Sequence, residues 1–251
     1  MNIEHLVIIR FSVIFNNRPE FNKRLPDLFK KERLDLRFEL FEKFCLWSLV
    51  NQTLINFKAI ILYDKKLPKE YLEKLINLTK DHKFIILHEW NINDNIMNNE
   101  WLQKYIDKSK ELLMTSRFDD DDIIRINLNE QMYDYIKRKR KYIKNCIISF
   151  ARGKFIYIDK DSYSISPCCY RGNIAIWLSH VTNIDSNKNI YSFDHSRISQ
   201  IRVFNLNYGF SWGCVNHNWG NDNRIKRMRH KYKGKNMIYK INLDEIYKFY
   251  S

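Results

Sequence analysis

Short apolar runs alternate along this chain with longer segments of helical periodicity. The runs are rich in Ile, Leu, Val and Phe, which is typical of buried strands. They lie at Leu6–Phe11, Phe57–Leu62, Phe84–Leu87, Leu112–Phe118, Ile147–Phe150, Phe155–Ile158, Ile201–Leu206 and Phe210–Val215. We expect each of these runs to be a strand.

Three segments between the runs predict helices. Residues 34–49 place their large apolar side chains on one stripe, and Lys69–Leu78 follows Pro68, a residue that is common at helix starts. Residues 123–144 are predicted to form one long amphipathic helix. Because strands and helices alternate over the first 120 residues or so, the pattern favours βαβ units and a mostly parallel sheet, with its ligand site at the carboxyl ends of the strands.

Four consecutive carboxylates, Asp119 to Asp122, follow the apolar run Leu112–Phe118. Adjacent anions repel one another unless a cation lies among them. Mg²⁺ and Mn²⁺ prefer hard oxygen ligands, and one or two carboxylates usually hold them while substrate phosphates fill other positions. The run therefore predicts a Mn²⁺ or Mg²⁺ site at a sheet edge. The alternative is a solvated turn that caps a helix beginning near Ile123, but capping needs only one or two carboxylates.

Composition limits the other possibilities. The 251 residues are 45% hydrophobic and include only six Gly and four Pro, so we expect one domain over residues 1–251 without a low-complexity linker. The apolar run near the N-terminus is too short for a signal peptide or a membrane span, and no other run approaches spanning length. An odd number of cysteines, five, without CxxC spacing suggests neither a disulfide framework nor a zinc site and fits the cytoplasm.

The net charge is +14, and two basic regions contribute to it, Lys137–Lys141 and Arg224–Lys233. Such regions can bind nucleic acid or an anionic membrane surface. For the first region a solvated helix face is the favoured interpretation. The second could also reach a diphosphate or an acidic acceptor glycan. We expect no specific nucleic-acid partner, while peripheral membrane contact stays open.

Five motifs occur in order over the first 125 residues or so: Glu4–Phe11, Arg37–Cys45, Ser48–Thr53, Ile61–Asp64 and Ser116–Asp122. Their order and spacing resemble the putative rhamnosyltransferase family of glycosyltransferases. The resemblance continues more faintly to the segment around His217. The Ser-Leu-x-x-Gln-Thr and Arg-x-Asp-x-Asp-Asp elements recur in glycosyltransferases of the GT-A fold, so they indicate the fold class better than the sugar.

This resemblance implies an α/β, GT-A-like fold, with a nucleotide-binding, mostly parallel sheet flanked by helices. Residues 1–125 would bind the nucleotide sugar, and residues 126–251 would form the acceptor-side portion. The donor would be a UDP, GDP or dTDP sugar, and the acceptor a glycan, a protein or a small molecule. A divalent ion bridging the donor diphosphate would neutralise the charge that develops on the leaving group.

The same resemblance gives roles to the acidic run. The Asp-x-Asp-Asp pattern falls on Asp119, Asp121 and Asp122, and Asp120 takes the variable slot among the donor-binding residues. Asp119 would contact the ribose, and Asp121 would be the best metal ligand, with Asp122 beside it. His217 would complete the metal shell or bind the diphosphate. The alternative for His217 is a loop histidine that bonds neighbouring amides.

Three further residues follow strand ends or precede the run. Asp64 is a candidate contact for the nucleotide base, although Asp is also a common turn starter. Arg10 could meet the base or a phosphate, and Arg117 precedes the carboxylates. Either arginine could instead pair structurally with the acidic run.

An inverting transferase, which the resemblance favours, needs a general base near the acceptor hydroxyl. Asp194 is the first choice, His195 the second and Asp222 the third. A helix N-cap is the alternative role for Asp194.

Two other classes of function compete with a transferase. One is a basic nucleic-acid-binding protein or a metal-dependent nuclease that uses the acidic run for phosphodiester chemistry. A nuclease would ordinarily draw carboxylates from several separated segments, whereas here they are concentrated in one run. The other is an inactive relative of the fold that serves as an interaction module.

Overall fold

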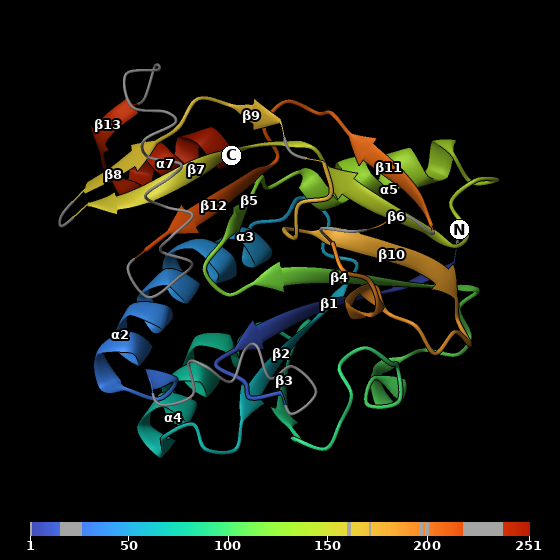
Figure 1. Ribbon diagram of the computed structural model, residues 1–251, viewed down its shortest axis with the longest axis horizontal. Helices are drawn as coiled ribbons and strands as arrows, with labels where there is room; N and C mark the ends of the chain where they lie inside the picture. The colour runs from blue at the N-terminus through green and yellow to red at the C-terminus, as the bar shows by residue number, and fades with distance from the viewer. Residues whose placement is uncertain are drawn as a thin grey trace.

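The structure is a computed structural model that describes residues 2–15, 27–159, 162–170, 172–195, 198, 201–217 and 238–251. Its larger sheet has seven strands in the order β11-β6-β10-β4-β1-β2-β3 (Figure 1). These strands are β1 (Ile3–Phe11), β2 (Lys58–Asp64), β3 (Ile85–Trp90), β4 (Leu112–Asp119), β6 (Cys146–Phe150), β10 (Leu178–Asn183) and β11 (Arg202–Leu206). Strands from both halves of the chain thus share one sheet.

The pairing within this sheet is mostly parallel. Strand β1 lies between β2 and β4 and is parallel to both, β3 continues the parallel order beyond β2, and β11 is parallel to β6. Only β10 runs against its neighbours, β4 and β6. The predicted fold class, α/β with a mostly parallel sheet flanked by helices, is confirmed.

A second sheet has the order β13-β8-β7-β12-β5, with β9 paired to β7. Its strands are β5 (Ile123–Ile124), β7 (Arg152–Asp159), β8 (Ser162–Ile165), β9 (Cys169–Tyr170), β12 (Trp212–Asn216) and β13 (Ile238–Ile241). Strand β4 of the first sheet and β5 of the second are separated only by residues 120–122. The acidic run is therefore one of the connections between the two sheets.

One nearly continuous helical rod precedes β2. It comprises α2 (Lys31–Leu40), the π-helical segment η2 (Phe41–Leu46) and α3 (Trp47–Val50). In the described part of the chain the other helices are α4 (Lys69–Thr79), α5 (Leu128–Arg138) and α7 (Leu243–Tyr250), with 3-10 turns η3 (Gln103–Tyr105) and η4 (Ile190–Ser192). None of the helices in the described ranges is long and apolar enough to cross a membrane.

Alternate residues of the central strands face two separate apolar cores. Val7 and Ile9 of β1 pack in the core that contains Phe38 and Phe41 of the helical rod. Leu6 and Ile8 point to the other face, where Trp90 closes the second core. Because both faces of β1 are covered in its middle, residues 6–9 form a continuous apolar run.

The predicted helix over residues 123–144 is wrong in its first part. Ile123 and Ile124 form β5, which pairs with β12, and α5 begins only at Leu128 and ends at Arg138. The proposed acidic cap of a helix near Ile123 is therefore excluded. Residues 139–141 of the first basic region also lie beyond the helix. Strands β8, β9, β10 and β13 and helix α7 were not predicted.

Candidate functional site

The carboxyl ends of β1, β2 and β4 meet at one edge of the large sheet. In Figure 1 the arrowheads of β1 and β4 point to the same side, where α2 also lies. Arg10 near the end of β1 is in register with Asp119, the last residue of β4. Asp64 ends the neighbouring β2. The structure thus brings three predicted site residues to the edge at which a parallel sheet binds its ligands.

Partly exposed and buried carboxylates alternate along the acidic run. The side chains of Asp119 and Asp121 are 29% and 16% exposed, whereas Asp120 and Asp122 are buried. A hydrogen bond of 3.4 Å from the Asp122 N–H to the Asp119 carbonyl closes a turn across them. Two of the four acids are therefore accessible from the edge, and two face the interior.

Asp119 is surrounded by cations from its own sheet. Its carboxylate lies 2.8 Å from Arg10 Nη2 and 3.8 Å from Arg117 Nη2. Both guanidinium groups also lie over the Tyr191 ring, at 5.5 and 5.1 Å from its centroid. Burial alone would raise the pKa of Asp119, but the charges of Arg10 and Arg117 lower it below its usual value. Asp119 is ionised.

Asp120 and Asp121 share a different cation, Arg37 of α2. Arg37 Nε donates to Asp120 Oδ2 at 3.0 Å, and Nη2 contacts the other oxygen of that carboxylate. Arg37 Nη1 lies 2.6 Å from Asp121 Oδ2, and His217 Nε2 lies 2.8 Å from the same oxygen. Burial would raise the pKa of Asp121, yet the Arg37 charge and the contact with His217 lower it below its usual range.

Asp122 differs from its neighbours. Its Oδ1 accepts a hydrogen bond of 3.1 Å from the Val215 N–H of β12. Burial, together with the charges of Asp121 and Asp119, raises the pKa of this carboxyl well above its ordinary value. Asp122 therefore links the run to the second sheet.

The Ser-Leu-x-x-Gln-Thr motif holds the segment that follows the run. Ser48 Oγ accepts from the Ile124 N–H at 3.1 Å. Gln52 donates through Nε2 to the Arg125 carbonyl at 2.9 Å and accepts from the Asn129 N–H at 3.1 Å. These buried contacts fix β5 and the start of α5, and so position the carboxylates just before them.

The remaining predicted residues have varied surroundings. Asp64 is buried and accepts from the Ile14 and Lys66 N–H groups at 3.3 and 2.9 Å, so its turn-forming role is present. His195 Nδ1 lies 3.4 Å from Arg117 Nη1, which connects it to the Asp119 cluster. Asp194 beside it is exposed. Asp222 and the basic region 224–233 lie outside the described residues.

Sequence reasoning did not assign Arg37 or Tyr191 to the site. Arg37 belongs to a motif that supported the family resemblance, and its charge is needed because buried carboxylates must be paired. The need to pair buried carboxylates with a cation could have indicated an arginine in the site. Nothing local in the sequence marks Tyr191, which reaches the site from η4.

Asp121 and His217 are the pair that best fits a divalent ion. Within the described residues no group of three or more His, Cys, Asp or Glu side chains converges as a metal site. A carboxylate oxygen and an imidazole nitrogen 2.8 Å apart form a mixed donor set that suits Mn²⁺. Such an ion usually takes its other ligands from substrate phosphates and water, so two protein ligands suffice.

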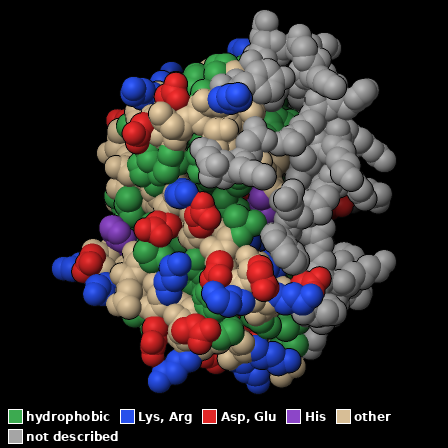
Figure 2. All heavy atoms as spheres, turned by 90° about the vertical axis from the view of Figure 1, so that its left-hand side faces the viewer, with side chains coloured by type: hydrophobic (Ala, Val, Ile, Leu, Met, Phe, Trp, Pro, Cys, Tyr) green, Lys and Arg blue, Asp and Glu red, His purple; other side chains and the backbone are tan. Residues whose placement is uncertain are grey.

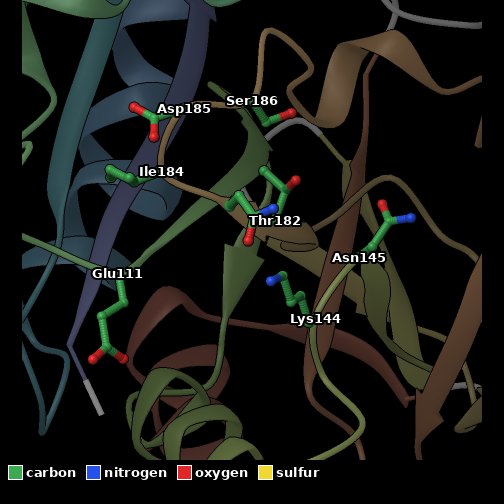
Figure 3. Close-up of a pocket in the computed structure, with 8 residues that line it drawn as sticks. Glu111, Lys144, Asn145, Thr182, Ile184, Asp185 and Ser186 are labelled. Carbon is green, nitrogen blue, oxygen red and sulfur yellow. The ribbon is translucent and has the colours of Figure 1, made fainter.

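A cavity of about 550 Å³ lies elsewhere on the molecule (Figure 3). It is lined by Glu111, just before β4 begins, and by Thr182 and Asn183 at the end of β10, with Lys144 opposite. This is the amino end of β4, so the cavity is separate from the carboxylate run.

Residues 4–230 match the family described as putative rhamnosyl transferase. The chain belongs to this family. The resemblance to this family is confirmed. No curated protein matches the sequence.

Solved structures of glycosyltransferases are similar to the fold at low identity. S. aureus TarS in complex with UDP-GlcNAc has 9% identity and a TM-score of 0.45, with 86% of this chain and 59% of that chain covered. The mannosyltransferase PcManGT from Pyrobaculum calidifontis, in complex with GDP-Man and Mn²⁺, has 9% identity and a TM-score of 0.42, with 91% and 61% covered. The chain thus spans about 60% of the length of these two solved chains, the TarS chain comprising residues 1–349.

Proposed function

We propose that this protein transfers a sugar from a nucleoside diphosphate donor to an acceptor, with the donor bound at the carboxyl edge of β1, β2 and β4. One observation carries the proposal: Asp121 and His217, 96 residues apart in sequence, place a carboxylate oxygen and a ring nitrogen 2.8 Å from each other. They do so beside Asp119, at the edge where a parallel sheet binds nucleotides. Membership of the family supports the same chemistry.

Asp121 and His217 would hold Mn²⁺ or Mg²⁺. When bound, the ion supplies positive charge to the diphosphate that leaves from the anomeric carbon. Asp121 is ionised and partly exposed, as a metal ligand must be. Asp122, next in the run, is the further candidate ligand, although its Oδ1 accepts the Val215 N–H.

The other donor contacts come from the same edge. Asp119 would accept a hydrogen bond from the ribose, with its orientation fixed by Arg10. Arg10 and Arg117, held over Tyr191, would add positive charge near the phosphates. Asp64 would contact the nucleotide base from the end of β2. Asp120 would act on the donor only through Arg37.

We assign the acceptor side to the second half of the chain and propose an inverting mechanism. Asp194 is the first candidate for the base that takes the proton of the acceptor hydroxyl, since it is exposed and adjoins His195, which contacts the Asp119 cluster through Arg117. His195 is the second candidate. We place the reaction in the cytoplasm, because none of the five cysteines forms a disulfide.

A nuclease is not favoured. The candidate metal-binding carboxylates all belong to the run Asp119–Asp122, whereas a nuclease would ordinarily draw its metal-binding carboxylates from several separated segments. On the face that carries α2 and α4, the described Lys and Arg side chains alternate with Asp and Glu rather than gather (Figure 2). The described residues of this face thus show no single-sign patch of the kind that binds nucleic acid.

Calorimetric titration with UDP, GDP and dTDP, each with and without Mn²⁺, tests the proposal. One of the three should bind, and its affinity should depend on Mn²⁺. Absence of binding by all three would contradict a transferase and favour an interaction module. Tight binding of a random DNA duplex with cleavage in Mg²⁺ would favour the nuclease.

A further inference from the structure

Arg37 of α2 contacts two carboxylates of the acidic run, Asp120 and Asp121. It lies in the last turn of α2, and its side chain is only 11% exposed. Its guanidinium contacts Asp120, Asp121 and His217, which come from two segments far from it in sequence. A buried guanidinium with this many partners has a defined position rather than a solvated one.

These contacts fall into two groups. Nε and Nη2 contact both oxygens of Asp120, which is buried. This bidentate pair anchors the side chain. Nη1 points the other way and lies 2.6 Å from Asp121 Oδ2 and 3.1 Å from His217 Nε2. One edge of the guanidinium is thus fixed, and the other lies between the two groups that suit a metal.

The Nη1 position conflicts with a bound divalent ion. Asp121 Oδ2 and His217 Nε2 are the same two atoms that the ion would take, and a guanidinium cannot deprotonate to make way for it. Two cations on one oxygen repel each other in a partly buried site. Either the ion or Nη1 can contact this pair, but not both.

We propose that Arg37 is a donor-binding residue whose Nη1 exchanges partners: it holds Asp121 and His217 when the site is empty, and it donates to the donor diphosphate when a metal occupies that pair. The Asp120 contact keeps the guanidinium at the edge in both states. This inference rests on the proposed function, because it needs a diphosphate at the run. It makes Arg37 a competitor of the free metal and a partner of the nucleotide.

Two effects of opposite sign follow for Arg37→Gln. Without nucleotide, removing the competing charge should raise the affinity for Mn²⁺ by about tenfold. With Mn²⁺ present, losing a hydrogen bond from a charged donor should lower the affinity for the nucleoside diphosphate by about tenfold or more. A residue that only supports the fold would weaken both.

Calorimetry on the full chain measures the two affinities. MnCl₂ is titrated alone, and then the tightest-binding of UDP, GDP and dTDP is titrated in saturating Mn²⁺. Lys31→Gln is the matched control, because it removes one positive charge from an exposed pair on the same helix. It should change neither affinity by more than about twofold, since exposed charges are screened.

Arg37→Gln leaves Asp120 buried without its partner, so a melting curve must accompany it. If the single variant unfolds, the double variant Arg37→Gln with Asp120→Asn replaces the ion pair by two neutral amides and is tested in its place. Opposite shifts of the two affinities support the inference. If the affinities for Mn²⁺ and for the nucleoside diphosphate shift in the same direction, the inference is overturned. A wild-type protein that binds no nucleoside diphosphate would instead refute the proposed function itself.

Discussion

The middle of strand β4 and its carboxyl end handle buried polar groups in opposite ways. In the middle, Ser116 Oγ lies 2.8 Å from His5 Nε2 on β1 and 2.6 Å from Ser179 Oγ on β10. Every group there is uncharged. At the end, a few residues further on, three carboxylates pair with arginines: Asp119 with Arg10 and Arg117, and Asp120 and Asp121 with Arg37.

The pKa values follow the same division. Burial lowers the pKa of His5 to about 3 and that of His180, on the neighbouring β10, to about 4, so both rings stay neutral. At the carboxyl end, arginines keep Asp119 and Asp121 ionised despite burial. In strand β4 and its neighbours, the charged groups of this comparison thus lie at the carboxyl end, where a ligand could use them, and the neutral ones lie in the middle. Substitutions at the end should therefore affect binding, and those in the middle should affect stability.

The largest effect is expected at Asp121. Asp121→Ala should abolish the Mn²⁺-dependent binding of a nucleoside diphosphate, a loss of at least about a hundredfold, because an anionic ligand is removed. Calorimetry measures this loss. The melting temperature should change little. Asp81→Ala, on the exposed turn after α4, serves as the control. Unchanged nucleotide affinity in the Asp121 variant would contradict the expectation that substitutions at the carboxyl end of β4 affect binding.

Asp194→Asn should separate acceptor chemistry from donor binding. As the general base, Asp194 acts on the acceptor hydroxyl, so its loss should lower turnover by about tenfold or more and leave donor affinity unchanged. Turnover, donor affinity and melting temperature are measured on this one variant. If Asp194 only caps a local element, Asn should preserve all three. Full turnover would move the assignment to His195.

His180→Phe tests the neutral middle of the sheet. Because folding lowers the pKa of His180 from 6.5 to about 4, the unfolded chain binds a proton that the folded chain does not. Stability from this source is present above pH 6.5 and is lost as the pH falls toward 4. The variant should reduce the loss of unfolding free energy between pH 7 and pH 4.5 by about 2 kcal/mol.

Denaturant unfolding at several pH values measures this effect in the wild type and in His180→Phe. Nucleotide affinity at pH 7.5 should stay the same in the variant. A reduced nucleotide affinity, without any change in how the free energy of unfolding depends on pH, would show that the middle of the sheet is not independent of its end.

Gln52→Ala should have the smallest effect. It removes the buried hydrogen bonds to Arg125 and Asn129, so the free energy of unfolding should fall by about 1 to 2 kcal/mol. Asn51→Ala, which removes an exposed contact one residue earlier, should change it by less than about 0.5 kcal/mol. Equal effects from both would contradict the clamping role of Gln52.

The sequence predicted the parts of the fold that depend on local pattern. Strands β1, β2 and β4 contain apolar runs because both their faces are covered, and their ends fell within a few residues of the expected positions. The position of the acidic run at a sheet edge followed directly. Strand β10 was not predicted because polar residues interrupt it, with Ser179, His180 and Thr182 all buried.

Contacts between distant segments could not be predicted. Ile123 and Ile124 continue the apolar periodicity of α5, and only their pairing with Gly213 and Trp212 places them in a strand. The cation expected among the carboxylates was a metal ion, and the structure adds Arg37 from a helix more than 80 residues earlier. Local propensity carries no information on such pairings.

The central claim is that Asp121 and His217 bind a metal together with a nucleoside diphosphate. Electron spin echo envelope modulation of Mn²⁺ bound with the tightest-binding nucleoside diphosphate tests it directly, because the method detects nitrogen and phosphorus nuclei coupled to the ion. The account predicts both an imidazole nitrogen and a phosphorus coupling in the wild type, with the nitrogen coupling lost in His217→Ala. A nitrogen coupling that persists in His217→Ala, or bound Mn²⁺ without phosphorus coupling, would contradict it.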